Sequence, residues 1–146
     1  MTSQNQYRMT NKFQQFTLKK INVQNKYSMT PLELKDYINF AVKRIYYISY
    51  PQGVTGSHCH KTEEELFVVM QGLCVAEIDR GNGLEKIPLE TGQAIYISNY
   101  VWHHFESFSP DCVLLALSST NYLADRSDYI EDYEDYLKIR DEKLRE

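Results

Sequence analysis

Two histidines separated by one residue are the side chains of this sequence best suited to chemistry. His58 and His60 lie in the stretch 53–72, which begins and ends with glycine. Residues two apart on a β-strand project from the same face, so both imidazoles would point into one space. Glu65 follows after a short polar turn and adds a carboxylate just before an apolar run. We therefore predict a site of convergent polar side chains.

The other two histidines, His103 and His104, lie together in a second segment that begins at Gly92. They end an apolar run that reads as a strand. The chain has four histidines in all, so every one of them falls in one of the two segments. Such grouping is unusual for surface histidines and favours a shared functional site.

Three imidazoles and one carboxylate permit two kinds of chemistry. As ligands they suit Fe, Mn, Ni, Cu or Zn with coordination positions left open. As acid–base groups, a neutral imidazole can take a proton next to a carbonyl while a hydroxyl or a second imidazole stabilises the enolate. The residue types alone do not separate these two interpretations.

Composition and charge exclude several classes of protein. The chain has 146 residues, 42% of them hydrophobic, which fits one soluble domain with a substantial core. Its formal charge is −4 and its basic residues are dispersed, so the chain offers no positive electrostatic field that would attract nucleic acid. No apolar run approaches the ~20 residues of a membrane span, and no signal peptide is evident. We expect a cytoplasmic protein that binds neither nucleic acid nor membrane.

The three cysteines are odd in number and irregularly spaced, which is typical of reduced thiols rather than a disulfide framework. Cys74 and Cys112 sit in apolar segments and are expected in the core. Cys59 lies between the paired histidines and should point to the opposite face, so we interpret it as a buried filler.

Short apolar segments recur at intervals of about ten residues, separated by Gly, Pro and Asn turns. The expected strands are 13–23, 27–34, 43–50, 54–60, 66–70, 74–79, 85–89, 94–98, 102–108 and 112–118. This pattern predicts an all-β sandwich or barrel. Residues 1–12 are polar and expected to be flexible, and 13–146 form a single domain.

The last segment changes to helical spacing. Tyr129, Tyr133, Tyr136 and Leu137 recur on one face, with acidic residues early and basic residues late, as the helix dipole favours. We predict a terminal α-helix, from about residue 127, laid on the barrel.

The spacing Gly-x4-His-x-His-x4-Glu-x6-Gly, followed by Gly-x10-His, resembles the two motifs of the cupin superfamily. The resemblance implies a double-stranded β-helix, which is a jelly-roll barrel. His103 takes the place of the last motif histidine, so His104 is expected on the outside or at an interface. The proline and glycine of the second motif are here Ser98 and Tyr100.

Several strings together resemble the cupin-fold 3,4-ketoisomerases that act on dTDP-4-keto-6-deoxyglucose. They are Lys-Arg-Ile-Tyr-Tyr-Ile at 43–48, Gly-Ser-His-Cys-His-Lys at 56–61, Val-Trp-His at 101–103, Phe-Ser-Pro-Asp-Cys-Val-Leu-Leu-Ala-Leu at 108–117 and Asp-Tyr-Ile-Glu-Asp-Tyr at 128–133. Their order and spacing span almost the whole predicted domain.

This resemblance implies an isomerase that makes a dTDP-3-keto-6-deoxyhexose for the deoxyaminosugars of surface glycans such as O-antigen. His58 and His60 would lie in the active site, with His60 as the base, and Tyr47 would bind or polarise the keto sugar. The resemblance also implies that the enzyme uses no metal or other cofactor. It further implies a homodimer that exchanges an N-terminal strand, and residues 13–23 would form that strand.

Four further residues are candidate substrate contacts: Arg44, Glu65, Trp102 and His103. Arg44 could pair with a ligand phosphate or with a carboxylate such as Glu65. Trp102 could stack on a base or sugar, or pack in the core. Tyr47 is adjacent to Tyr46, so one of the two must face the interior and the other the outside.

The chain departs from the ketoisomerase pattern at three places. The family's Arg-Gly is here Thr55-Gly56, its glutamine is Glu65, and its proline pair is Ser98-Asn99. Two other hypotheses therefore stand beside the isomerase. One is a metal-dependent cupin, an isomerase or dioxygenase that uses His58, His60, Glu65 and His103 as ligands. The other is a non-catalytic sugar-binding cupin.

Overall fold

A computed structural model describes residues 12–146 of the chain. Residues 1–11, most of the segment predicted to be flexible, lie outside the described part. The elements in chain order are β1 (Phe13–Thr17), β2 (Ile21–Val23), β3 (Tyr27–Met29), the 3₁₀ turn η1 (Leu34–Asp36), β4 (Arg44–Ile48), β5 (Cys59–His60), β6 (Glu65–Gln71), β7 (Leu73–Asp79), β8 (Leu84–Glu90), β9 (Gln93–Ile97), β10 (Trp102–Glu106), β11 (Val113–Ser118), β12 (Tyr129–Ile130) and α2 (Tyr133–Leu144).

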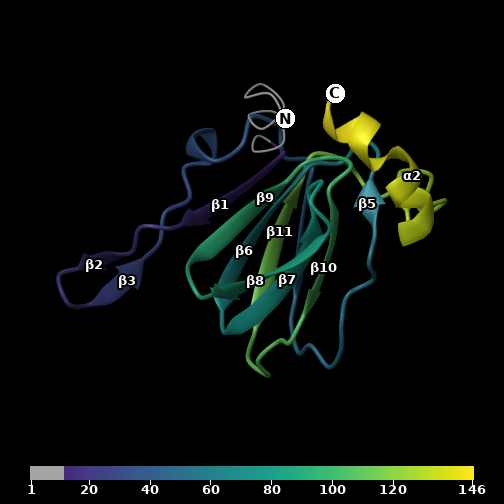
Figure 1. The fold of residues 1–146 in the computed structure, drawn as a ribbon. Coiled ribbons are helices and arrows are strands. Elements are labelled where there is room, and N and C mark those ends of the chain that lie inside the picture. The colour runs from purple at the N-terminus through teal and green to yellow at the C-terminus, as the bar shows by residue number, and fades with distance from the viewer. Residues whose placement is uncertain (1–11) are drawn as a thin grey trace.

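The strands form a β-barrel of two main antiparallel sheets, with α2 beside one end of it (Figure 1). One sheet has the order β1-β9-β6-β11-β4, and the other has the order β10-β7-β8. The main core lies between the sheets and includes Phe67, Ile95, Ile78 and Phe105. The predicted all-β barrel with a C-terminal helix is therefore confirmed.

The central strand β6 is buried on both faces, which explains why its sequence is apolar without alternation. Phe67 and Val69 face the barrel core. Leu66 and Val68 face outward and are covered by residues of the long connection between β1 and β4, including Ile38. The first five residues of β6, 65–69, are therefore buried, and they hold the strand in place behind the site that its first residue enters.

The N-terminal elements are shorter than predicted. The expected strand 13–23 is two strands, β1 and β2, and only β1 joins the main sheet, beside β9. The expected strand 27–34 is reduced to β3, which pairs with β2 in a hairpin that extends away from the barrel (Figure 1). Pro31 cannot donate a ladder hydrogen bond, which agrees with the early end of β3.

The helix begins later than predicted, at Tyr133 rather than near residue 127. The side chain of Asp132 accepts a hydrogen bond from the backbone N–H of Asp135 and so caps the helix. Just before this cap, β12 pairs with β5 instead of joining the helix. Tyr136 is fully buried and its hydroxyl donates to the carbonyl of Tyr100, which fastens the helix to the barrel.

No helix within residues 12–146 has the length and apolarity needed to cross a lipid bilayer.

Candidate active site

The paired histidines share one face, as their spacing predicts. β5 contains only Cys59 and His60, which pair with β12, and His58 just before it meets β10 through an isolated bridge to His103. The ring centroids of His58 and His60 are 4.7 Å apart, and their Nε2 atoms are 3.1 Å apart. Cys59 points the other way and is fully buried against Trp102 and Tyr136. Its predicted role as a core filler is confirmed.

His103 joins the pair through β10. Its backbone exchanges two hydrogen bonds with His58, of 2.9 and 3.2 Å. Its ring centroid is 4.8 Å from that of His58 and 5.8 Å from that of His60. The neighbouring His104 faces outward and lies 3.2 Å from a carboxylate oxygen of Glu106. Strand alternation therefore separates the two adjacent histidines in the predicted way.

Glu65, the first residue of β6, closes the cluster and is 2% exposed. Its Oε1 is 3.2 Å from Nε2 of His60 and 3.6 Å from Nε2 of His103. Its Oε2 accepts a 2.6 Å hydrogen bond from the hydroxyl of Tyr46. Burial alone would raise the pKa of Glu65, but the nearby His103 and His60 imidazoles outweigh burial and hold that pKa well below its ordinary value. Glu65 is therefore an ionised, buried carboxylate.

His60 has a carboxylate on both sides of its ring. Its Nδ1 is 3.0 Å from Oε2 of Glu63 and 3.1 Å from Oδ2 of Asp128, while its Nε2 faces Glu65. Burial would lower the pKa of His60, but hydrogen bonds to Glu63 and Glu65 raise it to about 9. His60 is thus an imidazolium at neutral pH, with 3% of its surface exposed.

His58 has the opposite electrostatic character. Burial, followed by the charges of His103 and His60, lowers its pKa to about 3. Its Nδ1–H donates to the carbonyl of Gly56 over 2.9 Å, which leaves the lone pair on Nε2. The ring is half-buried, so a ligand can reach it more easily than it can reach His60. The pair therefore combines a neutral imidazole with a charged one.

Four residues of the site were not among the predicted site residues: Tyr46, Glu63, Asp128 and Tyr129. Asp128 accepts hydrogen bonds from the backbone N–H groups of Thr62 and Glu63 besides contacting His60. The ring of Tyr129 lies 4.6 Å from that of His60, because β12 pairs Tyr129 with His60. The only sequence signal for these two was their place in the string at 128–133.

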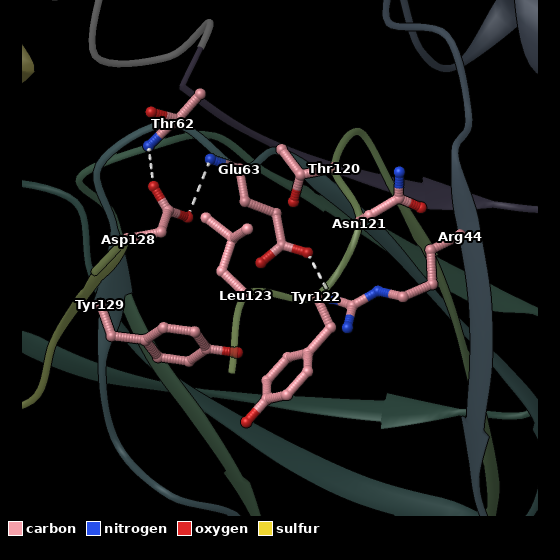
Figure 2. A pocket seen from close by; sticks show the side chains of 9 residues that line it. All are labelled: Arg44, Thr62, Glu63, Thr120, Asn121, Tyr122, Leu123, Asp128 and Tyr129. Carbon is pink, nitrogen blue, oxygen red and sulfur yellow. Dashed lines mark hydrogen bonds and ion pairs between the residues drawn. The ribbon is translucent and has the colours of Figure 1, made fainter. Parts of the chain in front are cut away.

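A pocket of about 130 Å³ has Glu63 and Asp128 in its wall (Figure 2). These are the two carboxylates that lie at Nδ1 of His60. The pocket is lined by Arg44, Thr62, Glu63, Thr120, Asn121, Tyr122, Leu123, Asp128 and Tyr129. The Arg44 guanidinium donates a 2.7 Å hydrogen bond to Glu63 and not, as one interpretation had it, to Glu65. Figure 2 shows this guanidinium beside Tyr122 at the pocket wall. Arg44 is thus held at the edge of the site by a carboxylate partner.

The structure does not bring Tyr47 or Trp102 to the histidine cluster of this chain. Tyr47 lies on the outer face of β4 and is 66% exposed, whereas its neighbour Tyr46 takes the interior position. Trp102 is buried against Tyr133 and Tyr136, on the side of β10 opposite His103. Trp102 therefore has the core role that was the alternative to stacking, and a catalytic role for Tyr47 stays a prediction.

The arrangement supports proton transfer next to a carbonyl. A neutral imidazole, His58, stands beside a fixed cation, His60, and the neighbouring Glu65 and His103 are buried. The same atoms also form a set of three nitrogens and one oxygen suited to a metal ion.

Comparisons with known proteins agree with this chemistry. The family model FdtA, described as WxcM-like, C-terminal, matches residues 10–141. A TDP-4-oxo-6-deoxy-alpha-D-glucose-3,4-oxoisomerase from Aneurinibacillus thermoaerophilus is 36% identical over 114 residues, which are 76% of this chain and 81% of that protein.

Two solved structures are similar in fold and sequence. The WlaRB TDP-quinovose 3,4-ketoisomerase from Campylobacter jejuni has a TM-score of 0.78 and 30% identity, over 88% of this chain and 99% of that one. QdtA, a sugar 3,4-ketoisomerase from Thermoanaerobacterium thermosaccharolyticum solved with TDP, has a TM-score of 0.79 and 28% identity, over 90% and 96%. With a family match over almost its whole length, this chain belongs to the FdtA family of WxcM-like, C-terminal proteins.

Proposed function

We propose that this protein is a sugar-nucleotide isomerase that converts dTDP-4-keto-6-deoxyglucose into a dTDP-3-keto-6-deoxyhexose. The observation that carries the proposal is the contact between a neutral imidazole, His58, and a buried imidazolium, His60. The relative from Aneurinibacillus thermoaerophilus is a 3,4-oxoisomerase by name, and its named substrate is TDP-4-oxo-6-deoxy-alpha-D-glucose, which supports the same reaction here. A QdtA variant has been solved in complex with TDP-4-keto-6-deoxyglucose, which supports the choice of substrate.

In the proposed reaction, Nε2 of His58 accepts the proton from C-3, which is acidic because C-4 carries the carbonyl. The electrons of the broken C–H bond form the C-3–C-4 double bond of an enediol, and the former carbonyl oxygen takes a proton. The C-3 hydroxyl then loses its proton and becomes the new carbonyl, while C-4 receives a proton. The hydrogens and electrons balance within the sugar, so the reaction needs no redox partner.

The role of base that the sequence analysis gives to His60 stays a prediction, and we propose the alternative that His58 takes this role, because its Nε2 carries a free lone pair at neutral pH. His60 Nε2–H lies 3.2 Å from Glu65 Oε1, and donating to that carboxylate leaves the His58 lone pair free for substrate. As a fixed cation, His60 would stabilise the negative charge that develops on the enediolate beside it. We therefore assign the proton transfer to His58 and the charge stabilisation to His60.

The wider setting of the reaction is part of the same proposal. The product suits the deoxyaminosugars of surface glycans, including the O-antigen of lipopolysaccharide, and the reaction would take place in the cytoplasm. We also propose a homodimer. Within this chain β1 pairs with β9, and an exchanged β1 from a second copy could make the same bonds. The exposed Tyr47 and Ile45 on the outer face of β4 would support such an association.

Incubation of the protein with dTDP-4-keto-6-deoxyglucose in deuterated water tests the proposal. NMR spectroscopy should detect loss of the C-4 carbonyl, a new C-3 carbonyl and deuterium at C-4 of the product. His58→Asn should abolish these changes, and His104→Asn, a substitution on the outer face, should leave them intact. Binding of the sugar nucleotide without any exchange or carbonyl shift would reject the isomerase and favour a sugar-binding protein.

A further inference from the structure

Cys74 and Cys112 are two buried thiols that are paired with each other inside the barrel. Both belong to the main core, and they are 2% and 1% exposed. The thiol of Cys74 donates a hydrogen bond to the sulfur of Cys112. The proposed isomerase reaction uses neither residue, so the contact between two thiols is a feature that this reaction does not account for.

The thiol pair lies at the end of the barrel away from the histidine cluster. The first residue of β11 lies beside the last residue of β6, so Cys112, just before β11, is far from Glu65. Along β7, Ile78 lies opposite His103, and Cys74 comes four residues earlier in the chain. Four residues of a strand span about 13 Å. A chemical change at the thiols would therefore leave the histidine cluster intact.

Backbone contacts hold the two chain segments of the pair together. The N–H of Ser109 donates to the carbonyl of Leu73 over 2.9 Å, and the N–H of Leu73 donates to the hydroxyl of Ser109 over 2.9 Å. Gly72 approaches so closely that an added Cβ would lie 2.8 Å from Cα of Cys112. Because the segments are fixed side by side, reaching the ~2.0 Å bond length of a disulfide requires only small rotations of the two side chains.

A pocket gives small molecules a route to the pair. It has a volume of about 430 Å³, and Cys74 lies in its wall together with Leu73 and Leu89. Hydrogen peroxide is only slightly larger than a water molecule, which occupies about 30 Å³, so the pocket can admit it. The third cysteine, Cys59, lies in a different cluster, packed against Trp102, and is fully buried.

We propose that Cys74 and Cys112 form an oxidation site, at which hydrogen peroxide converts the two thiols into a disulfide within one chain. One thiolate attacks an oxygen of the peroxide, the O–O bond breaks, and a sulfenic acid forms while the released hydroxide takes up a proton. The second thiolate attacks the sulfenic sulfur, the S–S bond forms, and hydroxide leaves and takes up the other proton. The two thiols lose two electrons in total, and one peroxide becomes two water molecules.

The surroundings of the thiols determine how fast they react. Burial raises the pKa of Cys74 to about 12. Burial also raises the pKa of Cys112, with the hydrogen bond from Cys74 opposing this effect and the charge of Asp111 adding to it. Since the thiolate is the reactive form, oxidation is slow at neutral pH and becomes faster at alkaline pH. The pair would thus stay reduced until exposure to peroxide is sustained.

Peptide mapping of the wild-type, full-length protein tests the site and requires no sugar substrate. The folded protein is treated with hydrogen peroxide at mildly alkaline pH, alkylated in denaturant and digested with trypsin without reductant. Cleavage after Lys and Arg puts the three cysteines on separate peptides: 45–61 with Cys59, 62–80 with Cys74, and 87–126 with Cys112. Mass spectrometry should find 62–80 joined to 87–126, with the total mass reduced by two hydrogen atoms. Peptide 45–61 should carry an alkylated thiol.

Thermal unfolding gives a second readout, because the disulfide would connect β7 of one sheet to the start of β11 in the other. Oxidation should raise Tm by at least about 5 °C, and dithiothreitol should reverse the rise. Cys112→Ala should show neither the linked peptides nor the rise in Tm, while Cys59→Ala should show both.

Three results would overturn the proposal. The first is folded, peroxide-treated wild type in which Cys74 and Cys112 are both still alkylated. The second is a product in which Cys59 is linked as often as either of them. The third is non-reducing electrophoresis in which the linked peptides come only from disulfide-bonded dimers, since the bond would then join two chains.

Discussion

Replacing each of the paired histidines by asparagine should give different results, because the two rings have different partners. His58 is half-buried and neutral, and its side chain bonds the backbone of Gly56. His58→Asn should cost at most about 1 kcal/mol of stability and lower kcat by about 10²–10⁴-fold, the usual contribution of a general base. His60 neutralises buried carboxylates, so His60→Asn should lower both activity and stability.

The stability loss of His60→Asn can be estimated from its charge state. A pKa of about 9 in place of the ordinary 6.5 corresponds to about 3 kcal/mol, which agrees with the ~3–5 kcal/mol cost of breaking a buried ion pair. Because the folded pKa is raised, this contribution is fully present below pH 6.5 and is lost as the pH rises through about 9. The difference in the free energy of unfolding between wild type and His60→Asn should therefore become smaller as the pH rises from 6.5 to about 9.

Urea unfolding across the pH range and an aminotransferase-coupled assay of kcat measure the two effects, with His104→Asn as the control. The reasoning fails if His58→Asn keeps kcat within about tenfold of the wild type. It also fails if His60→Asn is as stable as the wild type at about pH 6, or if the gap between them widens toward alkaline pH.

Three further substitutions follow from single contacts. Asp128→Asn removes a carboxylate from His60 Nδ1 and should lower kcat about tenfold and the His60 pKa measurably, as followed by NMR titration. Gly72→Ala should destabilise the fold by about 1–3 kcal/mol in urea unfolding, since Gly72 has a φ of +83° and an added Cβ would lie 2.8 Å from Cys112 Cα. Tyr136→Phe leaves the Tyr100 carbonyl without its donor and should lower stability by about 1–3 kcal/mol at unchanged kcat per folded molecule.

The parts of the site that follow from alternation could be predicted from the sequence. Spacing alone placed His58 and His60 on one face and separated His103 from His104, because side chains alternate whatever the strand's partner is. Alternation also required Tyr46 and Tyr47 to face opposite ways. Which of them faces inward depends on the pairing of β4 with β11, where Tyr46 lies opposite the buried Ala116. That register is a tertiary property.

The carboxylates around His60 could not be predicted from local pattern. Asp128 is 68 residues from His60 in sequence, and it reaches the ring only because β12 pairs with β5. The same pairing explains the error at the helix start, since residues 129 and 130 satisfy their backbone bonds in a sheet. The spacing of tyrosines and apolar residues is the same in β12 and in α2. Periodicity alone therefore could not show that the helix begins only after Asp132, which caps it.

The charge states of His58 and His60 in metal-free protein are the most direct test of the proposed mechanism. NMR of the imidazole ¹⁵N nuclei at neutral pH should find His58 neutral with its proton on Nδ1, and His60 protonated on both nitrogens until the pH approaches about 9. A neutral His60, or a His58 that carries a charge near neutral pH, would contradict the account.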